Sequence, residues 1–166
     1  MKLYIKQQVF SWGDKFTVKD EYGEDKYFVE GEIFTLGKKL HVYDMSGSEV
    51  AYVEQELFTF LPCYQIYCNG YQVAEITKEF SLFFPVYKIN RLGWEIEGDF
   101  LSHDYVITQN GQQIVSITKE WMTWGDSYVL DIENSTDEIM ALAVVLTIDC
   151  VTAPKSGSSI KISTRR

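Results

Sequence analysis

The sequence predicts a mainly β fold: a closed antiparallel barrel of about twelve strands, in six hairpins, around a central hydrophobic C-terminal α-helix. Aromatic residues make up 15% of the chain and there are only three prolines, which favours strands. One 14-residue pattern occurs four times, and an apolar segment of helical length follows the last copy. With 166 residues, we expect a single domain (1–166), with the barrel over 2–133, the helix over 137–151 and a basic tail over 153–166.

The repeated pattern predicts four of the hairpins. Its copies are "IKQQVFSWGDKFTV" (5–18), "VEQELFTFLPCYQI" (53–66), "ITKEFSLFFPVYKI" (76–89) and "ITKEWMTWGDSYVL" (117–130). One slot of the pattern holds a turn-forming residue, and the flanks alternate with a period of two, as strands do. Each copy therefore predicts a hairpin whose tip lies near that slot. The slot is occupied by Asp14, Pro62, Pro85 and Asp126. Two positions later comes the aromatic residue that is expected to begin the returning strand: Phe16, Tyr64, Tyr87 and Tyr128.

A second match predicts two more hairpins. The segment "VEGEIF" (29–34) resembles "IEGDFL" (96–101), and each precedes a second short strand, "LHVYD" (40–44) or "DYVIT" (104–108). Strands at such regular, short spacing are typical of antiparallel sandwiches and barrels. About twelve strands enclose more room than the strands' own side chains fill.

The segment "NSTDEIMALAVVLTIDCV" (134–151) fits that space. Its β-branched residues favour a strand, whereas its length favours a helix, because strands average only about 5–6 residues. Ser135 and Glu138 have the spacing of a capping box, which marks the start of a helix. A helix that is apolar on every side must be buried on every side or lie in a membrane. About 14 residues rise only about 21 Å, too short for a hydrocarbon core of about 30 Å. We therefore expect residues 137–151 to thread the barrel.

Charge and cysteine content limit the classes of partner and compartment. The formal net charge of −9 disfavours binding to nucleic acid and simple docking on an anionic membrane. The three cysteines, Cys63, Cys68 and Cys150, are typical of reduced thiols in a cytoplasmic protein. The N-terminus "MKLYIKQQVF" lacks the apolar region of a signal peptide. We expect no transmembrane segment, and a closed barrel without free sheet edges favours a monomer.

Several segments together resemble a known family. They are "FSWGDKFTVKDEYGEDKYFVEGEIFTLGKKLHVYD" (10–44), the "ITKE" strands, "WGDSY" (124–128) and "ALAVVLTID" (141–149). The chain resembles the LURP-one-related family, which belongs to the tubby C-terminal-like superfamily together with phospholipid scramblases. This resemblance implies a twelve-stranded barrel around a hydrophobic C-terminal helix. Plant members are tied to pathogen defence, tubby relatives bind phosphoinositides, and scramblases act at membranes; the resemblance implies no set of functional residues.

The sequence holds no pattern typical of an enzyme. The two histidines, His41 and His103, do not have metal-binding spacing. "CYQIYC" (63–68) has two cysteines but no second pair, so a zinc site is not expected. "DEYGED" (20–25) lacks the spacing of a calcium loop and reads as a solvated turn. Nucleophile and phosphate-loop motifs are missing as well, so we expect no catalytic residues, metal or cofactor.

Four lysines are the candidate ligand-binding residues. Lys38 and Lys39 lie in "LGKKLHV", which is expected to be a loop, and Lys78 and Lys119 lie on the more apolar face of the repeated strand. In the favoured interpretation that face reaches the rim of the barrel, where a lysine lays its stem on apolar surface and keeps its ammonium group in water. In the other, Lys78 and Lys119 face an anionic ligand or a buried carboxylate such as Asp149.

Three functional hypotheses follow. The first is a non-enzymatic cytosolic binding or interaction module that responds to stress and binds an unknown protein or lipid. The second is a peripheral phospholipid- or phosphoinositide-binding protein that resembles tubby and the scramblases. The third is a small-molecule carrier, or an enzyme, with a hidden pocket. The charge of −9 favours the first hypothesis over the second.

Overall fold

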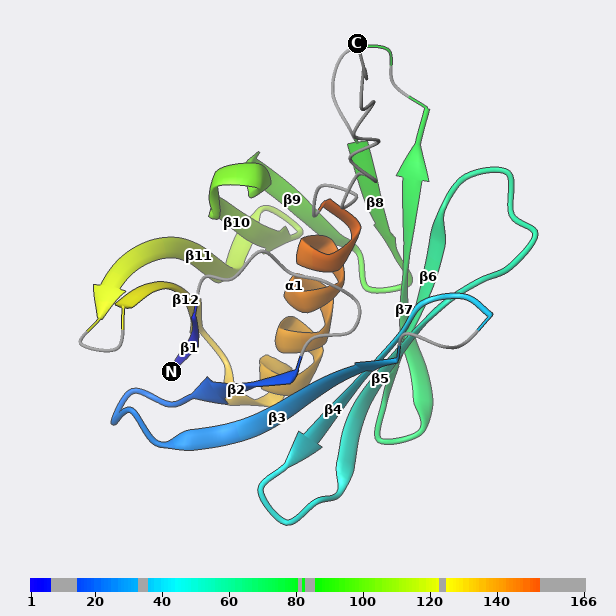
Figure 1. The fold of residues 1–166 in the computed structure, drawn as a ribbon. Helices are drawn as coiled ribbons and strands as arrows, with labels where there is room; N and C mark the ends of the chain where they lie inside the picture. Colours follow the sequence, from blue (N-terminus) through cyan, green and yellow to red (C-terminus); the bar gives the residue numbers. More distant parts are fainter. Residues whose placement is uncertain (7–14, 33–35, 81, 83–85, 123–124, 153–166) are drawn as a thin grey trace, which may run out of the picture.

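The computed structural model describes residues 1–6, 15–32, 36–80, 82, 86–122 and 125–152 (Figure 1). The described part contains twelve strands, two short 3-10 helices and one α-helix. The strands are β1 (Lys2–Lys6), β2 (Lys15–Lys19), β3 (Asp25–Glu32), β4 (Lys39–Asp44), β5 (Glu49–Gln55), β6 (Cys63–Cys68), β7 (Tyr71–Glu79), β8 (Val86–Asn90), β9 (Trp94–Asp99), β10 (Asp104–Gln109), β11 (Gln112–Met122) and β12 (Gly125–Ile132). The helices are η1 (Phe100–Ser102), η2 (Ser135–Asp137) and α1 (Glu138–Thr152).

All twelve strands belong to one antiparallel sheet that curls into a nearly closed barrel. Consecutive strands pair with each other except for β8 and β9, and the first strand, β1, pairs with the last, β12. The described residues of β8 and β9 lie side by side without a ladder between them. The predicted fold class is therefore confirmed, with a seam at β8 and β9 where the sequence predicts closure. This seam removes the premise of the monomer prediction, because two sheet edges remain.

The six predicted hairpins are all present. The four repeated segments span the pairs β1–β2, β5–β6, β7–β8 and β11–β12, and the shorter match spans β3–β4 and β9–β10. Burial alternates along the strands as a barrel requires, and in β3 the side chains of Tyr27 and Val29 face the core. Because the strands alternate in direction, these six hairpin tips lie at one end of the barrel.

The positions of the tips agree only partly with the prediction. Pro62 directly precedes β6, as a tip residue would. Asp126, however, lies within β12 opposite Trp121, and Gly125 already pairs with Met122, so the aspartate belongs to the returning strand rather than to the tip. Asp14 and Pro85 lie outside the described residues.

Helix α1 forms the core of the barrel (Figure 1). Its ten consecutive residues Ala141–Cys150 are all buried, which explains why the sequence is apolar on every side of the helix. The helix begins at the end where β12 finishes and runs back to the end that carries the six hairpin tips (Figure 1). No helix of the described residues is long and apolar enough to cross a membrane.

The start of the helix differs from the predicted capping box. The Asn134 side chain, not that of Ser135, caps this turn by accepting a hydrogen bond from the Thr136 N–H at 3.1 Å. Glu138 instead turns toward the barrel wall, where its carboxylate accepts from the Tyr27 hydroxyl at 2.9 Å and pairs with Lys26 at 2.6 Å. Tertiary contacts have taken the glutamate away from the local motif, and they tie the start of the helix to β3.

Candidate functional site

The structure separates Lys38 from Lys39. Lys38 lies in the loop before β4, and its carbonyl oxygen accepts from the Gln55 N–H at 2.8 Å. Lys39 is the first residue of β4, opposite Glu32 on one side and Glu54 on the other. Of the two, only Lys38 is a loop residue, and both side chains are half-buried.

Lys78 and Lys119 stand where their strands leave the core. On β7, Ile76 is fully buried and Lys78 is half-buried, and Phe80, directly after the strand, is 78% exposed. On β11, Ile117 is fully buried and Lys119 is exposed. All four candidate lysines thus lie toward the end of the barrel with the hairpin tips. They do not form one group, because they lie on or beside β4, β7 and β11, and these three strands are not adjacent in the sheet. Their role in binding a ligand remains a prediction.

Large apolar side chains gather at this same end. Among the described residues, twelve large hydrophobic side chains are exposed; nine of them lie at or beside the hairpin tips, and we call these nine the apolar rim. They are Leu36, Leu57, Phe58, Phe60, Phe80, Leu82, Val86, Leu101 and Trp121. The remaining three, Tyr22, Met45 and Tyr71, lie in or beside turns at the opposite end.

The apolar rim is most concentrated at the β5–β6 and β7–β8 hairpins. Phe58 and Phe60 are 104% and 97% exposed, so almost nothing of the protein covers them. Phe60 and Phe80 line one open hollow of about 560 Å³ together with one cation, the half-buried Lys78, and one carboxylate, the exposed Glu79. An apolar surface therefore projects from one end of the molecule.

Beneath the rim, inside the barrel, lies a buried polar cluster of Asp149, His103, Tyr128 and Tyr105. The Asp149 carboxylate on α1 lies 3.1 Å from Nε2 of His103 and accepts a short hydrogen bond from the Tyr128 hydroxyl. The His103 ring stacks on Tyr128 with a centroid separation of 4.2 Å. The sequence proposes lysines as partners of Asp149; its hydrogen bonds in the structure come from His103 and Tyr128.

Burial dominates the electrostatics of this cluster. It raises the pKa of Asp149, and the hydrogen bonds from His103 and Tyr128 oppose that shift. Burial and the nearby Asp149 charge hold the pKa of Tyr128 and of Tyr105 well above the usual tyrosine range. Nδ1 of His103 and the Tyr105 hydroxyl have no hydrogen-bond partner among the described residues. The cluster fastens the end of α1 to β12 and to the segment before β10.

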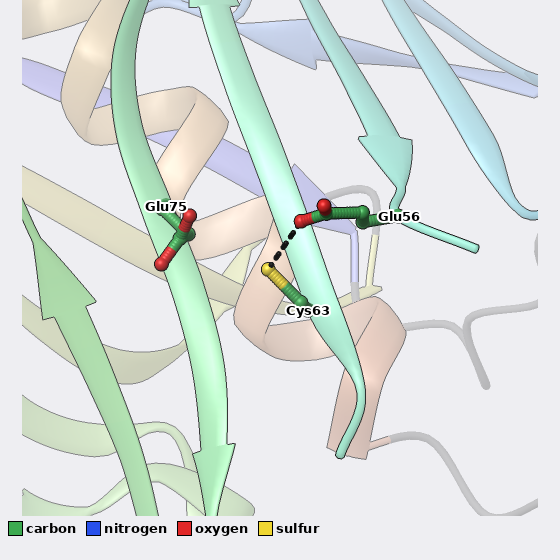
Figure 2. A group of neighbouring side chains, drawn as sticks. All are labelled: Glu56, Cys63 and Glu75. Atoms are coloured by element: carbon green, nitrogen blue, oxygen red, sulfur yellow. Dashed lines mark hydrogen bonds between the residues drawn. The ribbon is translucent and has the colours of Figure 1, made fainter. Parts of the chain in front are cut away.

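A second polar cluster lies on the outer face of the barrel, and we call Glu56, Cys63, Gln65 and Glu75 the Cys63 cluster. Figure 2 shows three of its members, Glu56, Cys63 and Glu75. Glu56 follows β5, Cys63 and Gln65 belong to β6, and Glu75 belongs to β7. The Cys63 thiol donates to Glu56 Oε2 at 3.3 Å, drawn as the dashed line in Figure 2. Burial and the two carboxylates raise the pKa of the Cys63 thiol to about 12, so the thiol keeps its proton at neutral pH.

The remaining sequence candidates have ordinary structural roles. His41 lies on the outer face of β4 between two carboxylates, with Nε2 2.8 Å from Glu32 and Nδ1 2.6 Å from Glu49. The acidic segment 20–25 holds the β2–β3 turn, where Asp20 accepts from the N–H groups of Tyr22 and Glu24.

Sequence reasoning missed both polar clusters. The buried cluster joins residues 46 and 21 positions apart, and the outer cluster joins β6 and β7 to the residue that follows β5. The alternation of β6 offered a signal for the second, because it places Cys63 and Gln65 on the outer face, away from the inward-facing Tyr64 and Ile66. The spacing of the two cysteines points to Cys68 as the partner of Cys63, but the Cys68 side chain lies on the inner face of the sheet and does not belong to the cluster.

Twelve antiparallel strands wrapped around a hydrophobic C-terminal helix define the class of this protein. A family model described as LURP-one-related matches residues 1–149. The chain belongs to the LURP-one-related family.

Two similar proteins agree with this assignment. The uncharacterised protein YxjI of Bacillus subtilis (strain 168) is 34% identical over 151 residues, which cover 91% of this chain and 93% of that protein. A crystal structure of an Arabidopsis thaliana protein superposes with a TM-score of 0.63 at 17% identity, over 90% of both chains. At that identity, the plant structure supports the fold alone.

Proposed function

We propose that this protein is a non-enzymatic binding module whose apolar rim docks on the surface of a lipid bilayer. One observation carries the proposal: of the twelve large hydrophobic side chains that are exposed in the described part of the chain, nine lie at one end of the barrel. Scattered single apolar residues are normal on a protein surface, whereas their collection at one end is typical of an interaction site.

The form of the rim favours a bilayer over a flat protein surface. Its side chains stand on separate hairpin tips, and Phe58 and Phe60 are almost fully exposed. Phenylalanine, leucine and tryptophan are the residues that enter the boundary between headgroups and acyl chains. Each fully buried phenylalanine contributes about 1.5–3 kcal/mol, so a few such tips suffice for reversible binding.

Charge supports the same orientation. The segment 153–166 follows α1, which ends at the rim, and contains four cations and no acidic residue. Each cation near an anionic membrane contributes about 1 kcal/mol. In the hollow, the charge of Lys78 is accompanied by that of Glu79, so the basic segment is the main source of attraction to such a membrane.

The other two hypotheses have less support. A protein partner in the cytosol agrees with the net charge of −9 and with three cysteines that form no disulfide, but these features do not explain why the apolar residues collect at one end. A carrier needs an internal cavity, and the ten buried residues of α1 occupy the middle of the barrel.

Vesicle flotation tests the proposal. Purified full-length protein should float with vesicles that contain phosphoinositide, and less with neutral vesicles. The triple substitution Phe58→Ser, Phe60→Ser and Phe80→Ser should abolish flotation, because it removes the most exposed aromatic side chains of the β5–β6 and β7–β8 hairpin tips. The matched control replaces the exposed apolar residues of the opposite end: Tyr22→Ser, Met45→Ser and Tyr71→Ser.

The control variant should float as the wild type does. Absence of flotation with both kinds of vesicle would remove the lipid hypothesis and leave a protein partner for the rim. Equal flotation of the two triple variants would show that the rim is not the contact surface.

A further inference from the structure

The Cys63 cluster brings three potential metal ligands to one point on the outer face of the barrel. Sγ of Cys63 and one carboxylate oxygen each of Glu56 and Glu75 all lie within 4.8 Å of one another (Figure 2). We propose that these three side chains form a binding site for a divalent cation of the zinc type. The proposal is independent of the lipid-binding rim.

The Gln65 side chain occupies the position that a cation would take. Its amide nitrogen lies 2.9 Å from Glu56 Oε2, 3.0 Å from Glu75 Oε2 and 3.7 Å from Cys63 Sγ. One partially positive NH2 group thus contacts all three candidate ligands at once. The three side chains are thus arranged around one central hydrogen-bond donor. The Gln65 amide group holds that central position here, and a cation would replace it there.

In the ion pairs that the described residues form, the charge of the two carboxylates is not balanced. Within the described residues, the ion pairs of lysine, histidine and the N-terminus engage other carboxylates, and neither Glu56 nor Glu75 belongs to one. Glu75 receives a further amide hydrogen bond, from Asn90 at 2.9 Å, which also fixes its orientation. Neutral donors hold the two acidic groups, so a divalent cation would bring the charge that these donors do not supply.

The backbone holds the three ligands in register. The Glu56 N–H donates to the Cys63 carbonyl at 2.9 Å, which extends the β5–β6 ladder by one residue. Gln65 lies directly opposite Glu75 in the β6–β7 ladder. Ligands around tetrahedral zinc are about 3.5 Å apart, given bonds of about 2.0–2.3 Å. The three ligand atoms, which lie within 4.8 Å of one another, reach this separation if the two glutamate side chains rotate and the Gln65 amide moves out.

The mixed ligand set selects the metal. A thiolate favours zinc and other soft or borderline ions, whereas Mg²⁺ and Ca²⁺ prefer oxygen ligands alone. Three protein ligands leave a fourth tetrahedral position for water. On binding, the bond from Sγ to hydrogen is replaced by a bond from Sγ to the metal, and the proton leaves to solvent.

Metal titration of the full chain tests the site. Metal-free, reduced protein is titrated with Zn²⁺ against a chromophoric chelator, and with Co²⁺ to observe the thiolate-to-cobalt charge-transfer band. We expect one ion per chain, proton release on binding and a charge-transfer band. Cys63→Ser should abolish the band and weaken Zn²⁺ binding by more than about tenfold, and Glu75→Gln should weaken it comparably.

Cys68→Ser is the matched control, because it removes a thiol from the same strand that faces the other side of the sheet. It should bind both metals as the wild type does. Circular dichroism verifies that each variant is folded, and Glu75→Gln tests the site even if Cys63→Ser fails to fold. The proposal is wrong if the wild type gives no charge-transfer band, or if the band survives in Cys63→Ser and disappears in Cys68→Ser.

Discussion

Asp149 is the one carboxylate among the ten consecutive buried residues of α1. Its burial is tolerated because two side chains of the barrel wall reach it: His103, whose Nε2 lies 3.1 Å away, and Tyr128. An ionised carboxylate in an apolar interior is costly unless it is hydrogen-bonded. Stability should therefore depend on these two partners, and on pH.

The substitution Tyr128→Phe should destabilise the protein by about 1–3 kcal/mol at pH 7. Burial raises the native pKa of Asp149 above its usual 3.8, and the Tyr128 hydrogen bond opposes this shift. Removing the hydroxyl raises the native pKa further. A raised carboxyl pKa destabilises the native state fully at pH values above the native pKa, and this destabilisation disappears at pH values below 3.8. The loss in the free energy of unfolding, measured with urea, should therefore be smaller at pH 4 than at pH 7.

Tyr105→Phe is the control for this prediction. The Tyr105 hydroxyl is buried in the same cluster without a hydrogen-bond partner among the described residues. Its removal should be neutral or stabilising, because the desolvation cost of an unpaired hydroxyl disappears. Equal losses for both variants, or equal losses of Tyr128→Phe at both pH values, would contradict this account of the cluster.

At the scale of single residues, the sequence predicts burial better than partners. The uninterrupted apolar run correctly predicts that residues such as Leu142 and Leu146 are fully buried. It cannot predict that His103 pairs with Asp149, because that contact depends on how β10 and α1 meet in the folded barrel. The Cys63 cluster escaped for the same reason, since its ligands come from different strands.

At the scale of elements, the local sequence pattern predicted the hairpins because the two strands of each hairpin are consecutive in sequence and pair with each other. Periodicity and turn residues are local signals, and an up-and-down sheet needs little else. The seam between β8 and β9 is different. Both are adjacent in sequence, yet their described residues form no ladder, and no local signal separates them from the pairs that do.

The β9–β10 hairpin depends on Gly98, which has φ +120° and lies opposite Tyr105. A Cβ at this position would lie 2.7 Å from the Asp104 carbonyl oxygen and 2.8 Å from Tyr105 Cα. Both contacts are with backbone, which cannot rotate away. Gly98→Ala should therefore cost about 3 kcal/mol, the sum of a disallowed backbone conformation and a steric clash.

Gly111→Ala serves as the comparison for that substitution. Gly111 also has a positive φ, +75°, but a Cβ there would meet nothing within 4 Å. Only the conformational cost of about 1 kcal/mol remains. Thermal unfolding of both variants separates the two contributions, and a Gly98→Ala protein as stable as Gly111→Ala would refute the clash.

At the scale of the whole molecule, the volume enclosed by the strands predicts the position of the helix. Twelve strands leave a space that their own side chains do not fill, and the only wholly apolar helical segment fits inside it. The structure places that helix at Glu138–Thr152, one residue later at each end than predicted. Tertiary contacts of Glu138 with β3 set the first residue, which is why capping alone did not locate it.

This arrangement makes α1 the core of the protein rather than an attachment to it. Deleting residues 137–166 would expose the inward face of every strand, including Ile5, Val29, Ile66 and Ile117, which are fully buried in the intact chain. The empty barrel would have no counterpart for this apolar surface, and its seam at β8 and β9 would leave two free edges for aggregation. We expect an insoluble or unfolded chain, measured by circular dichroism and size-exclusion chromatography.

The shorter deletion of residues 153–166 is the matched control for this experiment. The core residues of the described part of the chain all lie before it, so the truncated protein should remain folded, with cooperative thermal unfolding close to that of the full chain. The same variant removes four cations, and it should float less with anionic vesicles while keeping its fold. If the chain that lacks α1 were soluble and well folded, the barrel would not depend on its helix, and the volume argument behind the fold would fail.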